Sequence, residues 1–245
     1  MSIWDNLPTW ARWGRKYQEL EYQEPSSLPS FPKIVTFVYV HFAGQGHNEA
    51  YFKALPDAFV IVNTWLRSQG ASITRWNFKR VELGPINFYD GYTPIMSELI
   101  DRGEVFFDGR HAWYLFVSDN RSLNLYGTIG GDYWGQASNV PGVSFFDETG
   151  LFALAYDEAW PGTNWTRNMA CGAIAHELMH NLALIPDDPS LEHPEAPKHG
   201  AGCIMTGAYG LFPDCILERD GLIYGGMRGD EIEALISYGF AKPVV

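Results

Sequence analysis

The residues with the clearest chemical potential are His176, Glu177 and His180, which form an HExxH pattern in this 245-residue chain. They lie in a mostly apolar segment, NWTRNMACGAIAHELMHNLAL, which Thr163 or Asn164 can cap and which Pro186 ends. We therefore predict a helix. Four helical residues advance by about 400°, so the two imidazoles project about 40° apart, one turn from each other. Such a pair can bind one Zn²⁺ through two nitrogens.

Glu177 lies about 100° round the same helix from His176, beside the metal position. From there its carboxylate can take a proton from the attacking water. Short HExxH patterns also occur by chance, and two histidines on a helix face can be ordinary core residues. Metal binding is favoured here because the helix is apolar and capped, and because His193 and His199 follow shortly after it.

The segment HELMHNLALIP, followed later by Cys203-Ile204-Met205-Thr206-Gly207, resembles the metzincin clan of zinc endopeptidases. That clan has the pattern HExxHxxGxxH and then a turn with a methionine beneath the zinc, and the resemblance covers roughly residues 34–240. It implies that His176 and His180 are the first two ligands, that Glu177 is the general base and that Met205 is the turn methionine. Tyr209 would then stabilise the tetrahedral intermediate, or else be a partly buried rim residue.

The identity of the third zinc ligand is open, because this chain departs from the clan's pattern after the second histidine. Ala183 stands at the glycine position and Pro186 at the third histidine position. We favour His193, because imidazole is the commoner third ligand beside two histidines and the proline-rich loop after Pro186 could fold back. Two further candidates are Asp187 and His199. Asp187 ends the segment Leu184-Ile185-Pro186-Asp187, which resembles the variant of the clan's pattern that has an aspartate as third ligand.

The elements that must position this site are predicted from periodicity and from turn residues. We expect strands at Ile34 to Phe42, Ile73 to Leu83, Trp113 to Val117 and Leu151 to Tyr156. We expect helices at Asn48 to Ser68, with Pro56 as a kink or a later start, at Thr93 to Arg102, and at Asp230 to Tyr238. The glycine-rich stretch 127–146 would form an irregular rim or edge, with Tyr133, Trp134 and Phe145 lining side-chain pockets or packing in the core.

This order predicts an α+β fold, metzincin-like, with a twisted, mostly parallel sheet and two packed helices besides the HExxH helix. A small irregular C-terminal subdomain would end in a helix. We expect an extended lead-in at 1–33 and one catalytic domain at 34–245. Its N-terminal subdomain covers about 34–185 and its C-terminal subdomain about 186–245.

Composition narrows the classes of partner that this protein could bind. The net charge of −12 disfavours binding to nucleic acid and to anionic membranes. The sequence contains no run of 18 apolar residues, which a helix would need in order to cross a bilayer. The N-terminus lacks the apolar core of a signal peptide, which suits either a cytoplasmic protein or a secreted one without its signal. Cys203 and Cys215 could form a bridge, whereas Cys171 would be a small buried side chain in the helix.

Together these features predict a monomeric zinc-dependent endopeptidase that acts on a peptide or protein substrate. The departures at Ala183 and Pro186 motivate one alternative, a protein of this fold that binds zinc or a partner without cutting. A second alternative is an HExxH hydrolase of a small amide, and a third is a structural zinc site with four protein ligands.

Overall fold

The structure is a computed structural model that describes residues 33–106, 110–119, 143–183, 204, 211–214, 216–219, 222–227, 229–237 and 239–244. At its centre is a four-stranded sheet with the order β3-β1-β4-β5, and every neighbouring pair is parallel. The strands are β1 (Ile34–Ala43), β3 (Trp76–Pro85), β4 (His111–Val117) and β5 (Val143–Phe146). The protein is therefore α+β with a mostly parallel sheet, as the order of predicted elements indicated.

β1 lies between β3 and β4 and is buried along almost its whole length. Its side chains alternate between two hydrophobic clusters, with Phe37 and Tyr39 in one and Val38 and Val40 in the other. A strand covered on both faces has no polar side, which explains why the segment is β-branched and aromatic throughout. This strand was predicted from that composition, and the prediction is confirmed.

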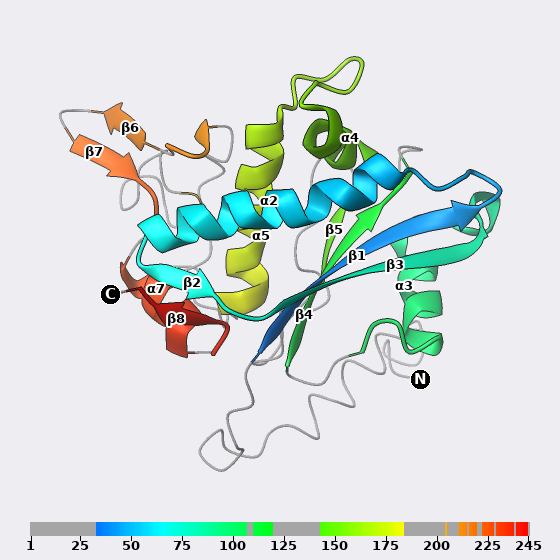
Figure 1. Ribbon diagram of the computed structural model, residues 1–245, viewed down its shortest axis with the longest axis horizontal. Coiled ribbons are helices and arrows are strands. Elements are labelled where there is room, and N and C mark those ends of the chain that lie inside the picture. The colour runs from blue at the N-terminus through cyan, green and yellow to red at the C-terminus, as the bar shows by residue number, and fades with distance from the viewer. Residues whose placement is uncertain are drawn as a thin grey trace, which may run out of the picture.

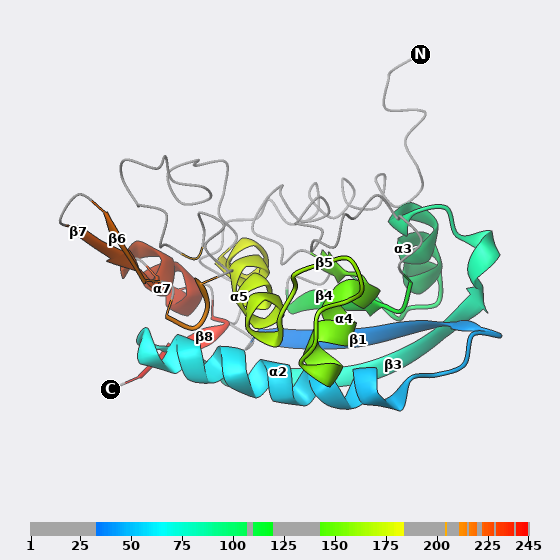
Figure 2. The same ribbon diagram turned by 90° about the horizontal axis from the view of Figure 1, so that it is seen from above.

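Helices cover both faces of the sheet (Figures 1 and 2). α2 (Glu49–Ser68), α4 (Glu148–Tyr156) and α5 (Arg167–Ala183) contact one another and share the cluster that contains Phe37. α3 (Tyr92–Asp101) packs on the opposite face, and Figure 2 shows it across β1 and β3 from α2. No helix in the described part of the chain is long and apolar enough to span a membrane.

α2 confirms the helix predicted for residues 48–68. Asn48 is its N-cap and accepts a hydrogen bond from the Ala50 amide at 3.0 Å. The helix runs without interruption through Pro56, so this proline marks neither a later start nor an end. α3 is also confirmed, with Pro94 in its first turn and Arg102 as its C-cap.

The segment Leu151 to Tyr156 was predicted as a strand, and that prediction is wrong because the segment belongs to helix α4. Asp147 caps this helix by accepting hydrogen bonds from the Thr149 and Gly150 amides. Apolar residues on several sides of a short helix give the same unbroken run as a buried strand, so periodicity cannot separate the two. The cap is the signal that distinguishes them.

Two other boundaries differ from the sequence prediction. The strand predicted at residues 73–83 is divided into β2 (Ala71–Ile73) and β3, with two residues between them. The HExxH helix begins at Arg167, and its capping side chain is Thr166, which accepts from the Met169 amide at 3.3 Å, rather than Thr163 or Asn164.

The C-terminal elements lie at one end of the molecule and α3 at the other (Figure 1). β6 (Ile216–Arg219) and β7 (Leu222–Gly225) form an antiparallel pair, and α7 (Gly229–Ser237) confirms the predicted final helix. The chain then adds β8 (Ala241–Pro243), which pairs antiparallel with β2. This pairing ties the C-terminal end to the N-terminal half.

Two side-chain predictions are settled by burial. Cys171 is fully buried in α5 with a free thiol, as predicted for a small core residue. Phe145 belongs to the cluster on the α3 face, on the side of the sheet opposite α5. It is therefore a core residue and does not line a pocket beside the HExxH helix. Tyr133, Trp134, Cys203 and Cys215 lie outside the described residues.

Replacing Phe37 by Ala should lower the free energy of unfolding by about 3–5 kcal/mol. The Phe37 ring is 1 % exposed and lies 5.2–5.7 Å, centroid to centroid, from four aromatic rings, those of Phe59, Phe78, Tyr114 and Phe116. Chemical denaturation measures the loss. The control is Val60→Ala, because Val60 is 60 % exposed and should change stability by about 0.5 kcal/mol or less. Equal losses for both variants would contradict this account of the core.

Candidate active site

The HExxH residues lie on α5, which packs against α2, α4, α7 and the strands β4 and β5. Every residue from Cys171 to Leu178 is buried. A helix enclosed in this way is apolar all round, as the alanines, isoleucine and leucine of this segment are. His176 and Glu177 are therefore polar side chains placed within a hydrophobic interior.

His176 is 8 % exposed, and its Nδ1 lies 2.9 Å from the carbonyl oxygen of Ile204. A carbonyl only accepts, so Nδ1 must carry the proton and donate it. In the neutral ring Nε2 then carries the lone pair, which is the form of imidazole that binds a metal. A backbone carbonyl that orients a ligating histidine through its other nitrogen is a usual outer-shell arrangement at metal sites.

Glu177 is 5 % exposed, and the backbone beside its carboxylate is held by the sheet. The hydroxyl of Tyr114, in the middle of β4, donates to the Glu177 carbonyl oxygen at 3.4 Å. Tyr114 is itself fully buried. This contact joins the centre of the parallel sheet to the turn of α5 that carries the HExxH residues, so the rigid sheet positions the candidate general base.

The burial of an imidazole and a carboxyl at adjacent positions has an electrostatic consequence. Charged and polar groups removed from water cost free energy unless a partner compensates them. A divalent cation beside such groups supplies the largest local charge in a site of this kind. The tautomer of His176 and the buried carboxyl of Glu177 therefore fit a Zn²⁺ ion.

The other predicted site residues are described only in part. His180 lies on α5 one turn after His176, and its backbone alone is described. Several predicted residues lie outside the described residues, namely His193, Asp187, His199, Met205 and Tyr209. Within the described part of the chain, no three His, Cys, Asp or Glu side chains come close enough together to hold a metal ion.

The structure brings one distant segment to the HExxH helix. Ile204 is fully buried and its carbonyl contacts His176, 28 positions earlier in the chain. Ile204 directly precedes Met205. The residue before the expected methionine turn is therefore next to the first expected ligand.

Sequence reasoning missed the roles of Tyr114 and Ile204. Tyr114 was assigned only to an apolar strand, and nothing in the spacing links it to a helix 63 positions away. Ile204 contributes its backbone rather than its side chain, so its residue type carries no signal. No family model matches the chain, and no curated protein matches it in sequence.

Proposed function

We propose that this protein is a zinc-dependent endopeptidase of metzincin type, in which His176 and His180 bind the metal and Glu177 is the general base. The observation that carries the proposal is the hydrogen bond from His176 Nδ1 to the Ile204 carbonyl at 2.9 Å. It orients the imidazole for metal binding. It also supports the resemblance, because the segment with Met205 is expected beneath the metal.

The chemistry follows from these positions. His176 and His180 would hold a Zn²⁺ ion, which when bound would supply Lewis-acid chemistry to the scissile carbonyl and would lower the pKa of a bound water from about 15.7 towards 7. Glu177 accepts the proton of the attacking water and later passes it to the leaving amine. The water-poor surroundings of Glu177, which is 5 % exposed, strengthen its electrostatic interactions with the reacting groups.

A peptide substrate would bind as an additional strand, through backbone hydrogen bonds to an edge of the sheet. The stretch expected to build this edge, 127–146, is described only from residue 143 onward, where it forms β5. β5 ends the described sheet next to β4 and contacts α5. The contact between β5 and α5 supports the proposal that a peptide binds along this edge, near the HExxH helix.

The zinc affinities of three single-residue variants should identify the third ligand. We expect His193→Ala to lower zinc affinity by more than about tenfold, since even outer-shell changes at metal sites cost 10–100-fold. Asp187→Ala and His199→Ala are the matched variants and should bind zinc as the unmodified protein does. Competition with a chromophoric chelator measures all three. Unchanged affinity in His193→Ala, with a loss in one of the other two, would transfer the role to that residue.

The proposal is tested by removing and restoring the metal. The chelated protein should not cleave denatured casein, and one equivalent of Zn²⁺ per chain should restore cleavage. Mg²⁺ should not, because it prefers oxygen ligands to imidazole. Zinc binding without any cleavage would instead favour a non-catalytic zinc-binding protein, and no zinc binding would overturn both readings.

A further inference from the structure

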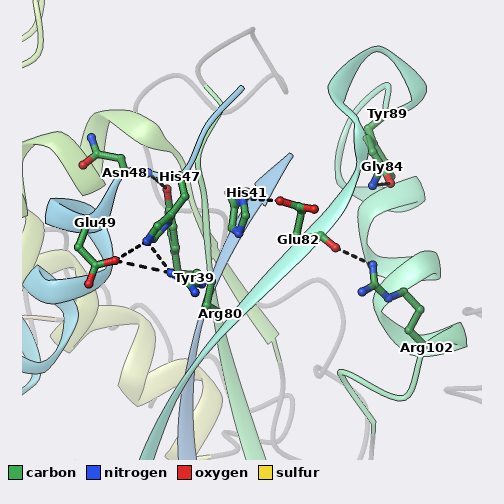
Figure 3. Close-up of polar contacts among 10 residues, drawn as sticks. All are labelled: Tyr39, His41, His47, Asn48, Glu49, Arg80, Glu82, Gly84, Tyr89 and Arg102. Atoms are coloured by element: carbon green, nitrogen blue, oxygen red, sulfur yellow. Dashed lines mark hydrogen bonds and ion pairs between the residues drawn. The ribbon is translucent and has the colours of Figure 1, made fainter. Parts of the chain in front are cut away.

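A second polar cluster lies near the carboxyl end of β1, away from α5 (Figure 3). We call it the His41 cluster, and its members are His41, His47, Glu49, Arg80 and Glu82. Tyr114, which contacts Glu177, pairs in register with Phe37. His41 is four residues further along β1, about 13 Å along the strand. The cluster is therefore separate from the HExxH site and does not depend on the zinc chemistry proposed there.

His41 is a buried histidine without a hydrogen bond at Nδ1. The residue is 6 % exposed, and its ring stacks on that of Tyr39 at 5.6 Å. The nearest opposite charge is Glu82, whose Oε2 lies 3.7 Å from Nδ1 and whose side chain is 63 % exposed. A proton on His41 would thus place a charge in the interior with one partly hydrated counter-ion.

The neighbours of His41 are a second imidazole and a guanidinium. The ring centroids of His41 and His47 are 5.3 Å apart. His47 Nε2 lies 2.6 Å from Arg80 Nη1 and 2.5 Å from Glu49 Oε2, and Arg80 Nη1 lies 3.6 Å from the same carboxylate oxygen. Glu49 is therefore already shared by His47 and Arg80. Its third cationic partner is Lys53, whose Nζ lies 3.8 Å from Oε1.

The remaining charged groups act elsewhere. On the β4 and α4 side, Asp119 follows β4 and its charge acts on Glu148, which also accepts a hydrogen bond from Tyr51 at 3.1 Å. The Tyr39 hydroxyl accepts from the Asn48 amide at 3.4 Å. The groups facing His41 from its own strand, from the following loop and from β3 are thus Tyr39, His47, Arg80 and Glu82.

The cluster holds the loop between β1 and α2. This loop contains Gly44 and Gly46, with φ of +84° and +78°, and no atom would meet a Cβ at either position within 4 Å. It is attached to β1 by the ring contacts of His47 with His41 and Tyr39, by the hydrogen bond from the Asn48 amide to the Tyr39 hydroxyl, and by the hydrogen bond from the Gln45 amide to the Phe42 carbonyl oxygen at 3.2 Å. Two glycines at positive φ give the chain the freedom to swing once these attachments are lost.

We propose that the His41 cluster is an acid-sensitive latch, in which neutral His41 holds loop 44–48 and the first turn of α2 against β1, and protonation of His41 releases them. Charging this ring would bring a cation against His47 and Arg80. Opening the loop lets water reach the ring. Asn48 then leaves its place over Tyr39, and the N-terminal turn of α2 loses its cap.

The direction of the pH dependence follows from burial. Burial, the largest effect, lowers the pKa of His41 from 6.5, as do His47 and Arg80, while Glu82 raises it. Well above pH 6.5 His41 is neutral whether the loop is closed or open, so the latch is fully effective. As the pH falls below 6.5 towards the lowered pKa, the open state takes up the proton first, and opening becomes more favourable.

Hydrogen exchange read by mass spectrometry tests the latch in the full chain. After correction for intrinsic exchange, amides of residues 44–52 should exchange severalfold faster at pH 5.5 than at pH 7.5, while β4 amides change little. His41→Phe keeps a ring on Tyr39 and removes the titrating group, so it should abolish the difference. His111→Phe is the matched control, a histidine stacked on Trp113 at 5.2 Å, and should retain it.

Burial raises the pKa of Asp147 to about 6, so this residue titrates in the same range. It does so in all three proteins, and its effect on the exchange rates therefore cancels when they are compared. The latch is overturned if residues 44–52 of the unmodified protein show no acid-induced increase, or an increase shared by β4. It is also overturned if folded His41→Phe retains the full increase. Should His41→Phe not fold, the localisation of exchange in the unmodified protein still decides the matter.

Discussion

Replacing Glu177 by Gln is expected to reduce peptide hydrolysis by a factor on the order of 10²–10⁴ while zinc content stays that of the unmodified protein. The amide occupies nearly the same volume as the carboxylate but cannot accept the proton of the attacking water. Because Glu177 is proposed to lie beside the metal rather than to bind it, its replacement should leave the proposed imidazole ligands in place. Casein cleavage rates and metal analysis of the same preparation provide the two measurements.

The control for this variant is Glu158→Gln, at an exposed glutamate just after α4. It removes the same charge from the chain and should cleave at the unmodified rate. Full activity in Glu177→Gln would show that another group is the base. Loss of zinc together with activity would show instead that Glu177 is a ligand, which the helix geometry argues against.

The second large effect is expected at the metal itself. His176→Ala should weaken zinc binding by well over about 100-fold, because it removes a proposed ligand, and outer-shell changes alone already cost 10–100-fold. Cleavage should fall to background at any zinc concentration that the protein tolerates. The hydrogen bond to Ile204 is lost in the same variant, so the segment before Met205 should also become less protected from hydrogen exchange.

His180→Ala should lose zinc to the same extent, because His180 follows His176 by four residues on α5 and is proposed as the second ligand. His111→Ala is the matched control, since it removes an imidazole from β4 without touching α5. Competition with a zinc chelator measures all three affinities. Wild-type affinity in His176→Ala would remove the HExxH helix from the metal site.

The main elements of the fold were predictable where local composition and tertiary environment agree. β1 is apolar because both of its faces are covered, and α2 repeats its apolar residues every three or four positions because one face packs on the sheet. α4 was missed because its apolar residues do not form a stripe. Its cap, Asp147, was the available signal.

The site was predictable only in its local part. The helix and its HExxH spacing depend on neighbouring residues, and α5 confirms that His176, Glu177 and His180 share one helix. The hydroxyl of Tyr114 and the carbonyl of Ile204 reach α5 through tertiary contacts that residue spacing does not encode. The same holds for His41 and His47, whose rings lie 5.3 Å apart although nothing in their spacing indicates a shared cluster.

The third ligand could not be derived because it depends on how the chain leaves α5. A glycine at that point would have indicated a sharp turn back to the metal, and this chain has Ala183 there. His193, Asp187 and His199 differ in how the following segment must fold to reach the helix. That path is a long-range property, so spacing alone leaves the three open.

The most direct test of the central claim is the digestion of a broad peptide library by the zinc-loaded protein, with Glu177→Gln as the blank. We expect bonds within the peptides to be cut, a chelator to stop the cutting, and the Glu177→Gln digest to match a protein-free sample. Internal cleavage excludes an enzyme specific for small amides and excludes a purely structural zinc site. No internal cleavage by protein shown to hold one zinc per chain, over a wide range of pH, would contradict the account.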